Sequence, residues 1–209
     1  MKAAQFKTPS SPSRDESSYK SVQPPRAPKL TRERRALRSP RRYLSAGHIA
    51  WLCDIASQEG RSDPELFDLL LGGLNLLERC PTDKIPQVVV GLELRHLEAV
   101  GALPDFDSCT ECGDDLSLEA YRQADTMGLA CRRHAGLPRR PVLLQALQAL
   151  RTLRQTSGRD WPSLQLGAEV RAAAALAAVW LAAALEQRSP YRRMVFQGAA
   201  SRESDLHGV

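Results

Sequence analysis

Apolar residues recur at helical spacing through most of the chain after residue 42. In YLSAGHIAWLCDIASQEG, Leu44, Ile49 and Leu52 lie near one helical face, and Gly60 follows as a stop. This pattern predicts a first helix over about residues 43–58.

The second helix is predicted from SDPELFDLLLGGLNLLERC. Ser62 with Glu65 three residues later forms a capping box, and Pro64 lies in the first turn, where a missing N–H costs little. Gly72 and Gly73 weaken the helix locally and indicate a close approach by a neighbouring element. The predicted buried stripe consists of Leu66, Leu70, Leu74 and Leu77.

The segment IPQVVVGLELRHLEAVGALP carries two signals. Its consecutive valines favour a strand, whereas Val90, Leu94 and Leu97 repeat at helical spacing and Gly101 supplies a stop. From the repeat and the stop, we predict a third helix.

Two further helices are predicted nearer the C-terminus. PVLLQALQALRTLRQ places Leu143, Leu147 and Leu150 on one face. GAEVRAAAALAAVWLAAALEQ then has 14 uncharged residues from Ala172 to Leu185, too few to span a bilayer. A helix that is apolar on every side is expected in the middle of a helical domain, where small side chains let its neighbours approach.

The beginning of the chain has a different composition. Residues 1–31 contain TPSSPS and VQPPRAP and almost no large apolar side chains, so they cannot offset the entropy cost of ordering. We therefore predict three parts: a disordered basic arm rich in Ser, Pro and Arg over residues 1–42, a helical domain over 43–198, and a flexible tail over 199–209.

Charge is unevenly distributed along the chain. Residues 1–42 hold 12 Lys/Arg against 3 Asp/Glu, and the remainder holds 17 basic and 21 acidic side chains. A basic arm of this kind suits an acidic polymer such as DNA or RNA. The residues of the arm that we predict to contact nucleic acid are Arg26, Lys29, Arg32, Arg34, Arg35, Arg38, Arg41 and Arg42.

The pattern CTECGDDLSLEAYRQADTMGLACRRH contains two pairs of metal-ligand residue types. Cys109 and Cys112 precede Gly113, which suits a tight turn, and Cys131 and His134 follow after an 18-residue spacer. Four such donors at this spacing fit tetrahedral zinc, so we predict a structural Zn²⁺ site. The predicted fold class is accordingly all-α: a helical bundle with an inserted zinc-finger-like module at about residues 105–138.

Other interpretations of the cysteines remain open. Cys109 and Cys112 could form a redox pair, although nothing in the sequence indicates the βαβ unit in which such pairs occur. A decayed site without metal is a second alternative. Catalytic zinc is disfavoured, because four protein donors leave no position for water. Cys53 and Cys80 are interpreted as small buried apolar residues.

No catalytic motif is evident, and we predict a protein that is not an enzyme and has no small-molecule substrate. His48 and His96 are isolated on helices, where a histidine is usually a surface or core residue. No apolar run reaches the length of a membrane-spanning helix, and the start lacks a signal-peptide pattern, so a cytoplasmic protein without a membrane partner is expected. A transit peptide is the alternative for the Arg- and Ser-rich start.

Several of these stretches resemble one protein family. The order YLSAGHIAWLCDIASQEGRSDPELFDLLLGGLNLL, VVVGLELRHLEAVGALPDFDSCTECG and GLACRRH resembles the C-terminal helical region of RecO, the bacterial recombinational repair protein. The resemblance covers about residues 43–155, with a weaker part to 198. Cys109, Cys112 and Cys131 match the family's cysteines, and His134 stands where the usual fourth ligand is cysteine.

The resemblance implies a mediator that binds DNA, anneals complementary strands and helps to load a recombinase. It also implies RecR-like and single-strand-binding proteins as partners, and a nucleoid-associated location. Arg132 and Arg133, and Arg139 and Arg140, would extend the DNA-binding surface, with solvated charge as the alternative for all four.

The resemblance does not extend to the family's N-terminal OB barrel. MKAAQFKTPSSPSRDESSYKSVQPPRAPKL offers none of the alternating apolar strands that an OB fold requires. An alternative function is therefore a protein-interaction adaptor of the repair and replication machinery that has lost direct binding to single-stranded DNA.

Overall fold

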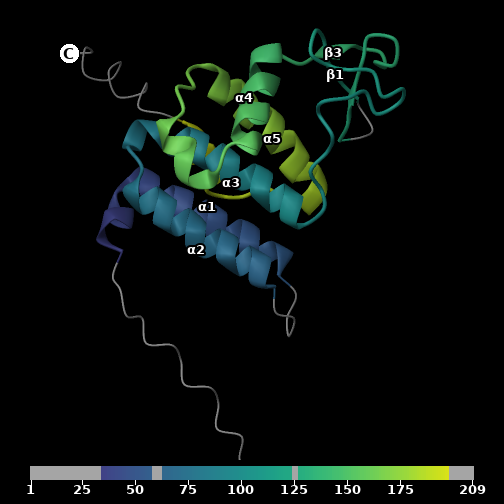
Figure 1. Ribbon diagram of the computed structural model, residues 1–209. Coiled ribbons are helices and arrows are strands. Elements are labelled where there is room, and N and C mark those ends of the chain that lie inside the picture. The colour runs from purple at the N-terminus through teal and green to yellow at the C-terminus, as the bar shows by residue number, and fades with distance from the viewer. Residues whose placement is uncertain (1–33, 58–62, 124–126, 198–209) are drawn as a thin grey trace, which may run out of the picture. The chain divides into compact units, whose positions relative to one another are not determined.

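The computed structural model describes residues 34–57, 63–123 and 127–197 (Figure 1). Arg26, Lys29 and Arg32 of the predicted arm, Ser62 and the predicted tail lie outside the described residues. The α-helices are α1 (Pro40–Ala56), α2 (Pro64–Arg79), α3 (Ile85–Ala99), α4 (Leu144–Gln155), α5 (Glu169–Leu185) and α6 (Arg192–Phe196). The 3₁₀ helices are η1 (Arg35–Arg38), η2 (Thr82–Lys84) and η3 (Gly158–Ser163).

Helix α3 is the central element of the fold. It contacts α1 and α2 on one side and α4 and α5 on the other, and η3 also packs against it (Figure 1). Val88, Val89 and Val90 are consecutive and all buried, so this part of the helix is covered on every side. The helix ends as predicted, with Gly101 at a φ of +70° and the N–H of Ala102 donating to the carbonyl of Leu97 at 2.8 Å.

The expectation that the alanine-rich helix is the central one was wrong. Helix α5 buries Ala173, Ala177 and Trp180 against its neighbours α3 and α4. Its opposite side is open, and Val179 is 37% exposed. Alanine allows close packing on one face without requiring burial on the other, because it has little apolar surface to hide. Among the described helices, none is long and apolar enough to cross a membrane.

Both N-terminal helices begin at a proline, which needs no intrahelical N–H partner there. Helix α1 begins at Pro40, earlier than predicted, so the predicted boundary between arm and domain at residue 42 falls inside this helix. In α2 the N-cap is Asp63, whose carboxylate accepts a hydrogen bond from the N–H of Leu66 at 3.1 Å. Asp63 therefore performs the role that the sequence pattern assigned to Ser62.

The prediction of an entirely helical protein was incomplete. Three short strands, β1 (Tyr121–Arg122), β2 (Leu129–Ala130) and β3 (Arg140–Pro141), form an antiparallel sheet in the order β2-β1-β3. Each strand has two residues, too few for an alternating pattern to show in the sequence. Leu143, which was predicted to share a face with Leu147 and Leu150, precedes α4 and is 65% exposed.

A buried charged network links α3 to both ends of the described chain. Glu93 is fully buried, and its carboxylate accepts two hydrogen bonds from Arg192, at 2.6 and 2.8 Å. His48 Nε2 lies 2.8 Å from the same carboxylate, and His48 Nδ1 lies 2.9 Å from the Ser189 hydroxyl. Burial raises the pKa of Glu93, but Arg192 and His48 outweigh it and hold the pKa below its ordinary value.

His96 is the second buried histidine. Neither ring nitrogen has a hydrogen-bond partner among the described groups, and burial lowers its pKa to about 4, so the ring is neutral at pH 7. Both histidines that the sequence raised as possible general bases therefore lie inside the helical body.

Removing Arg192 should destabilise the fold strongly. We expect Arg192→Met to lower the free energy of unfolding by about 3–5 kcal/mol, because it leaves the buried charge of Glu93 without its main partner. Urea unfolding measures the loss. The control is Arg193→Met, whose exposed side chain predicts a change within about 0.5 kcal/mol. Equal losses in the two variants would contradict this account.

Two glycines give neighbouring side chains room to approach helices. A Cβ at Gly91 would lie 2.8 Å from the ring of the buried Trp161, and one at Gly73 would lie 3.2 Å from Leu92. A Cβ at Gly72 would meet nothing within 4 Å. The close approach predicted for this glycine pair is therefore made by Gly73.

Gly91→Ala and Gly72→Ala form a matched pair of helix substitutions. Both gain helix propensity of about 0.5–1 kcal/mol. Only Gly91→Ala forces a methyl group into the Trp161 ring, at an overpacking cost of about 1–3 kcal/mol. We expect Gly72→Ala to raise the thermal midpoint and Gly91→Ala to lower it. A Gly91→Ala protein as stable as Gly72→Ala would show that the tryptophan shifts at no cost.

Candidate metal centre

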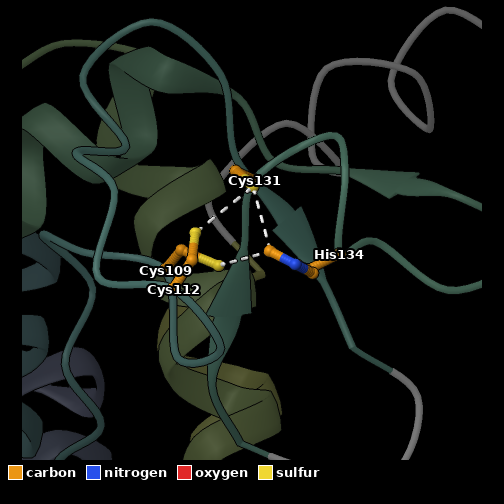
Figure 2. Close-up of side chains that lie close together, drawn as sticks. All are labelled: Cys109, Cys112, Cys131 and His134. Carbon is orange, nitrogen blue, oxygen red and sulfur yellow. Dashed lines mark hydrogen bonds between the residues drawn. The ribbon is translucent and has the colours of Figure 1, made fainter.

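The predicted ligands come from two turns of the segment between α3 and α4, which we call the insertion. Cys109 and Cys112 belong to a turn after α3, whereas Cys131 directly follows β2 and His134 lies in the next turn. Figure 2 shows the four side chains pointing toward one another from the two turns. The structure thus brings together all four residues that the sequence selected.

Backbone hydrogen bonds shape each turn. The N–H of Cys109 donates to the backbone carbonyl of Asp114 at 2.7 Å, and the N–H of Gly113 donates to the carbonyl of Cys109 at 2.8 Å. Gly113 has a φ of +75°, the left-handed conformation that its place after Cys112 predicted. In the second turn, the N–H groups of His134 and Ala135 donate to the carbonyl of Cys131 at 3.1 and 2.9 Å.

The spacing of the donor atoms fits a tetrahedral ion. Zn–S bonds of about 2.3 Å and Zn–N bonds of about 2.0–2.1 Å imply S···S separations of about 3.8 Å and S···N separations of about 3.6 Å. Cys112 Sγ lies 3.9 Å from Cys131 Sγ. His134 Nδ1 lies 3.7 Å from Cys109 Sγ and 3.5 Å from Cys131 Sγ. The four ligand atoms all lie within 4.8 Å of one another, so this group could hold a metal ion.

Neighbouring groups lower the pKa of two of the sulfurs, which favours the thiolate form that binds a cation. Burial raises the pKa of Cys109, but the backbone amides of Cys131, Glu111 and Cys112 outweigh it and lower the pKa to about 6. The pKa of Cys131 is also lowered, since amides of the second turn and His134 outweigh its burial.

The pKa values of the other two predicted ligands, Cys112 and His134, are raised. A backbone amide of Asp114 lowers the pKa of Cys112, but burial and hydrogen bonds within the cluster raise it to about 11. Hydrogen bonds to Cys109 and Cys131 raise the pKa of His134. Thiols this close resist ionising together, and a bound cation would remove that resistance.

Arg133 lies beside the cluster. Its Nη2 donates to Asp114 Oδ2 at 2.6 Å and lies 4.0 Å from Cys112 Sγ. This contact joins the two turns on their exposed side. Arg133 was predicted to contact DNA, and in the structure its guanidinium is paired with a carboxylate of the insertion.

The insertion is attached to the helices by packing and by charge. The ring of Phe106 stacks on Trp180 of α5 with centroids 5.5 Å apart, and Phe106 is fully buried. Arg151 of α4 donates to Asp107 at 2.6 Å and to the carbonyl of Phe106 at 3.2 Å. The cluster is therefore held at a defined place on the α4–α5 side of the helical body.

The sequence of the chain matches a known protein family. The family model described as recombination protein O C terminal matches residues 37–186, most of the chain. The chain belongs to the RecO family. The matched region contains the four ligand residues and α1 to α5.

Curated relatives named DNA repair protein RecO agree with this assignment. The chain is 32% identical to the protein of Anaeromyxobacter dehalogenans over 117 residues, which cover 54% of the chain and 45% of the relative. It is 31% identical to that of Heliobacterium modesticaldum over 135 residues, which cover 60% of the chain and 47% of the relative. The chain thus spans just under half the length of these RecO proteins.

Six of the predicted nucleic-acid contacts fall into two groups of three. Arg34 donates to Asn75 at 2.8 Å and pairs with Glu78 at 3.3 Å, Arg41 donates to the carbonyl of Val195 at 3.4 Å, and Arg42 donates to the carbonyl of Leu77. These three are tied to the helical body. Three others of the set are exposed: Arg132, Arg139 and Arg140.

The two cysteines outside the cluster have the role that the sequence predicted. Cys53 and Cys80 are buried and free. Burial raises the pKa of Cys53 to about 11, so this thiol stays protonated and packs as an apolar group. Phe106 and Asp114, which support the metal centre, carried no sequence signal, because each acts through a partner distant in the chain.

Replacing one ligand should abolish metal retention. We expect Cys131→Ser to reduce the metal content of the purified protein from about one equivalent to below about a tenth, because three donors leave the cluster open. Elemental analysis of protein prepared without chelator measures this. The matched control is Cys53→Ala, which should keep the full metal content. Equal metal in both variants, or none in the unaltered protein, would show that the cluster does not hold metal.

Proposed function

We propose that the chain is a non-enzymatic mediator of recombinational DNA repair that binds DNA and supports strand annealing and recombinase loading. Membership of the RecO family, over a match that includes the ligand cluster, is the observation that carries this proposal. RecR-like and single-strand-binding proteins are the partners that it implies, and the cytoplasmic nucleoid is its place of action.

The cluster has a structural role in this proposal, with Cys109, Cys112, Cys131 and His134 as ligands of Zn²⁺. Four protein donors complete a tetrahedral shell and leave no open position for a substrate or water. The N–H of Thr110 donates to the carbonyl of Leu129 at 3.0 Å, so the two ligand-bearing turns already meet through the backbone. A metal would fix them together and so set the orientation of the exposed arginines on the insertion.

DNA binding in this proposal is electrostatic and tolerant of sequence. Arg132, Arg139 and Arg140 are exposed on the insertion, and Arg26, Lys29, Arg32, Arg35 and Arg38 complete the proposed set. Arginine forms bidentate contacts with phosphate, and neutralised phosphates release counterions, which makes affinity fall with salt.

A second candidate function is a protein-interaction adaptor without direct binding to single-stranded DNA. One observation favours it: Arg34, Arg41 and Arg42 are engaged with the helical body and are not free to contact phosphates. This reduces the number of cations available for DNA in the first forty-two residues.

A salt series separates the two functions. We expect a fluorescein-labelled single strand to bind the full chain with an affinity that falls steeply between 50 and 200 mM salt, with a log–log slope of about −0.7 for each phosphate contacted. Fluorescence anisotropy measures the slope. The adaptor function predicts no such binding while association with a RecR-like protein persists.

Deleting residues 1–33 tests the contribution of the arm. This boundary leaves Arg34 and its contact with Glu78 intact, so the helical body keeps its packing. A shallower salt slope would support a role of the arm in DNA binding. An unchanged slope would assign binding to the helical body and the insertion alone.

A further inference from the structure

A groove lies between the small sheet and the start of helices α4 and α5. It has a volume of about 570 Å³. Arg122 of β1 and Arg140 of β3 line it from the sheet, and Arg171 lines it from α5. Among the described residues that line the groove, none is acidic and none is aromatic.

Two of these arginines are placed unfavourably against each other. Arg122 and Arg140 are directly opposite in the antiparallel pairing of β1 and β3. Like charges in such a cross-strand pair destabilise a sheet. The sheet has only two residues in each strand, so it has little pairing energy to offset the repulsion.

The same guanidinium groups have no counterion among the residues that the structure describes. Within the described part of the chain, the side chains of Arg122, Arg140 and Arg171 form no hydrogen bond or ion pair. Arg151, Arg154 and Arg192, in contrast, are paired with carboxylates. An anion in the groove would relieve the repulsion and supply the missing partners.

We propose that this groove binds the sugar–phosphate backbone of single-stranded nucleic acid. The inference rests on the proposed DNA-binding function and assigns it a location, with Arg122 and Arg171 as contacts that the sequence pattern did not single out. Three cations in one groove can pair with more than one phosphate, which favours a polyanion over a single anion. The absence of aromatic lining residues among those described predicts contact with the backbone and no base stacking.

The lining of the groove favours nucleic acid over an acidic peptide. Four of its eleven lining residues are alanines, at positions 146, 168, 172 and 175. Such small side chains offer little surface to the large apolar anchor that a docked peptide normally inserts. Aliphatic side chains of this kind can still lie against sugar rings.

The test is a triple variant, Arg122→Gln, Arg140→Gln and Arg171→Gln, with a matched control that removes the same charge elsewhere. The control is Arg79→Gln, Arg159→Gln and Arg188→Gln, three exposed arginines of α2, η3 and the segment after α5. The probe is a fluorescein-labelled 20-nucleotide oligothymidylate, titrated by anisotropy over a salt series.

We expect the groove variant to lose about tenfold or more in affinity at 50 mM salt and its log–log salt slope to become shallower by about 2, the value for three lost phosphate contacts on a single strand. The control should keep the slope of the unaltered protein. Thermal unfolding should show the groove variant at least as stable as the control, because the cross-strand repulsion is gone. If the triple variant does not fold, Arg140→Gln and Arg171→Gln singly should each make the slope shallower by about 0.7.

Each other result overturns the proposal in a distinguishable way. If the groove variant and the control lose affinity equally, binding depends on net charge and the groove is not the site. If the groove variant binds oligothymidylate normally but no longer binds a labelled peptide of alternating Asp and Leu, the groove is a peptide site. If the unaltered protein binds no oligothymidylate, the proposed function fails together with the groove.

Discussion

The burial of most of α3 is the constraint on which the rest of the structure depends. Each buried group on this helix needs a partner or a space inside the protein. Gly91 provides the space for Trp161, and the carboxylate of Glu93 requires hydrogen-bond partners. Those partners are His48 and Arg192, which lie 45 and 99 residues from Glu93 in the sequence. One buried carboxylate thus ties α1 and α6 to the middle of the fold.

The insertion uses two different means of stabilisation. On the side of the helical body, Phe106 stacks on Trp180, so an apolar contact positions the first cysteine turn. Away from this contact, three sulfurs and an imidazole gather between its two turns. A small segment of this kind buries little area with which to fix its own loops, and a metal held by this group would supply a cross-link. The strands that hold Arg122 and Arg140 belong to the same segment, so the metal centre and the groove are parts of one local structure.

Arginine in this chain serves two purposes that the sequence does not separate. Arg42 and Arg192 are internal cations that satisfy carbonyl or carboxylate oxygens of the helical body. Arg122, Arg140 and Arg171 line an open groove, and none of them is paired with a carboxylate in the described part of the chain. The net charge of +5 therefore does not distinguish the cations that hold the fold together from those that are free to bind an anion. It also gives no location for the second kind. Under the proposed function, the anion that these cations would bind is the phosphate backbone of nucleic acid.

The sequence by itself determined the features that depend on near neighbours. The helices over 64–79 and 85–99 follow from apolar periodicity, proline and glycine, and the helix over 169–185 follows from its long uncharged, alanine-rich run. The Cys₃His group follows from the spacing of cysteine and histidine, because each pair lies within one turn. Only the tertiary structure decided that α3 and not the alanine-rich α5 is central, that Asp63 caps α2, and that Arg122 faces Arg140. Burial, ion pairing and strand register are set by residues far away in the chain, and a pattern read over a few turns does not contain them.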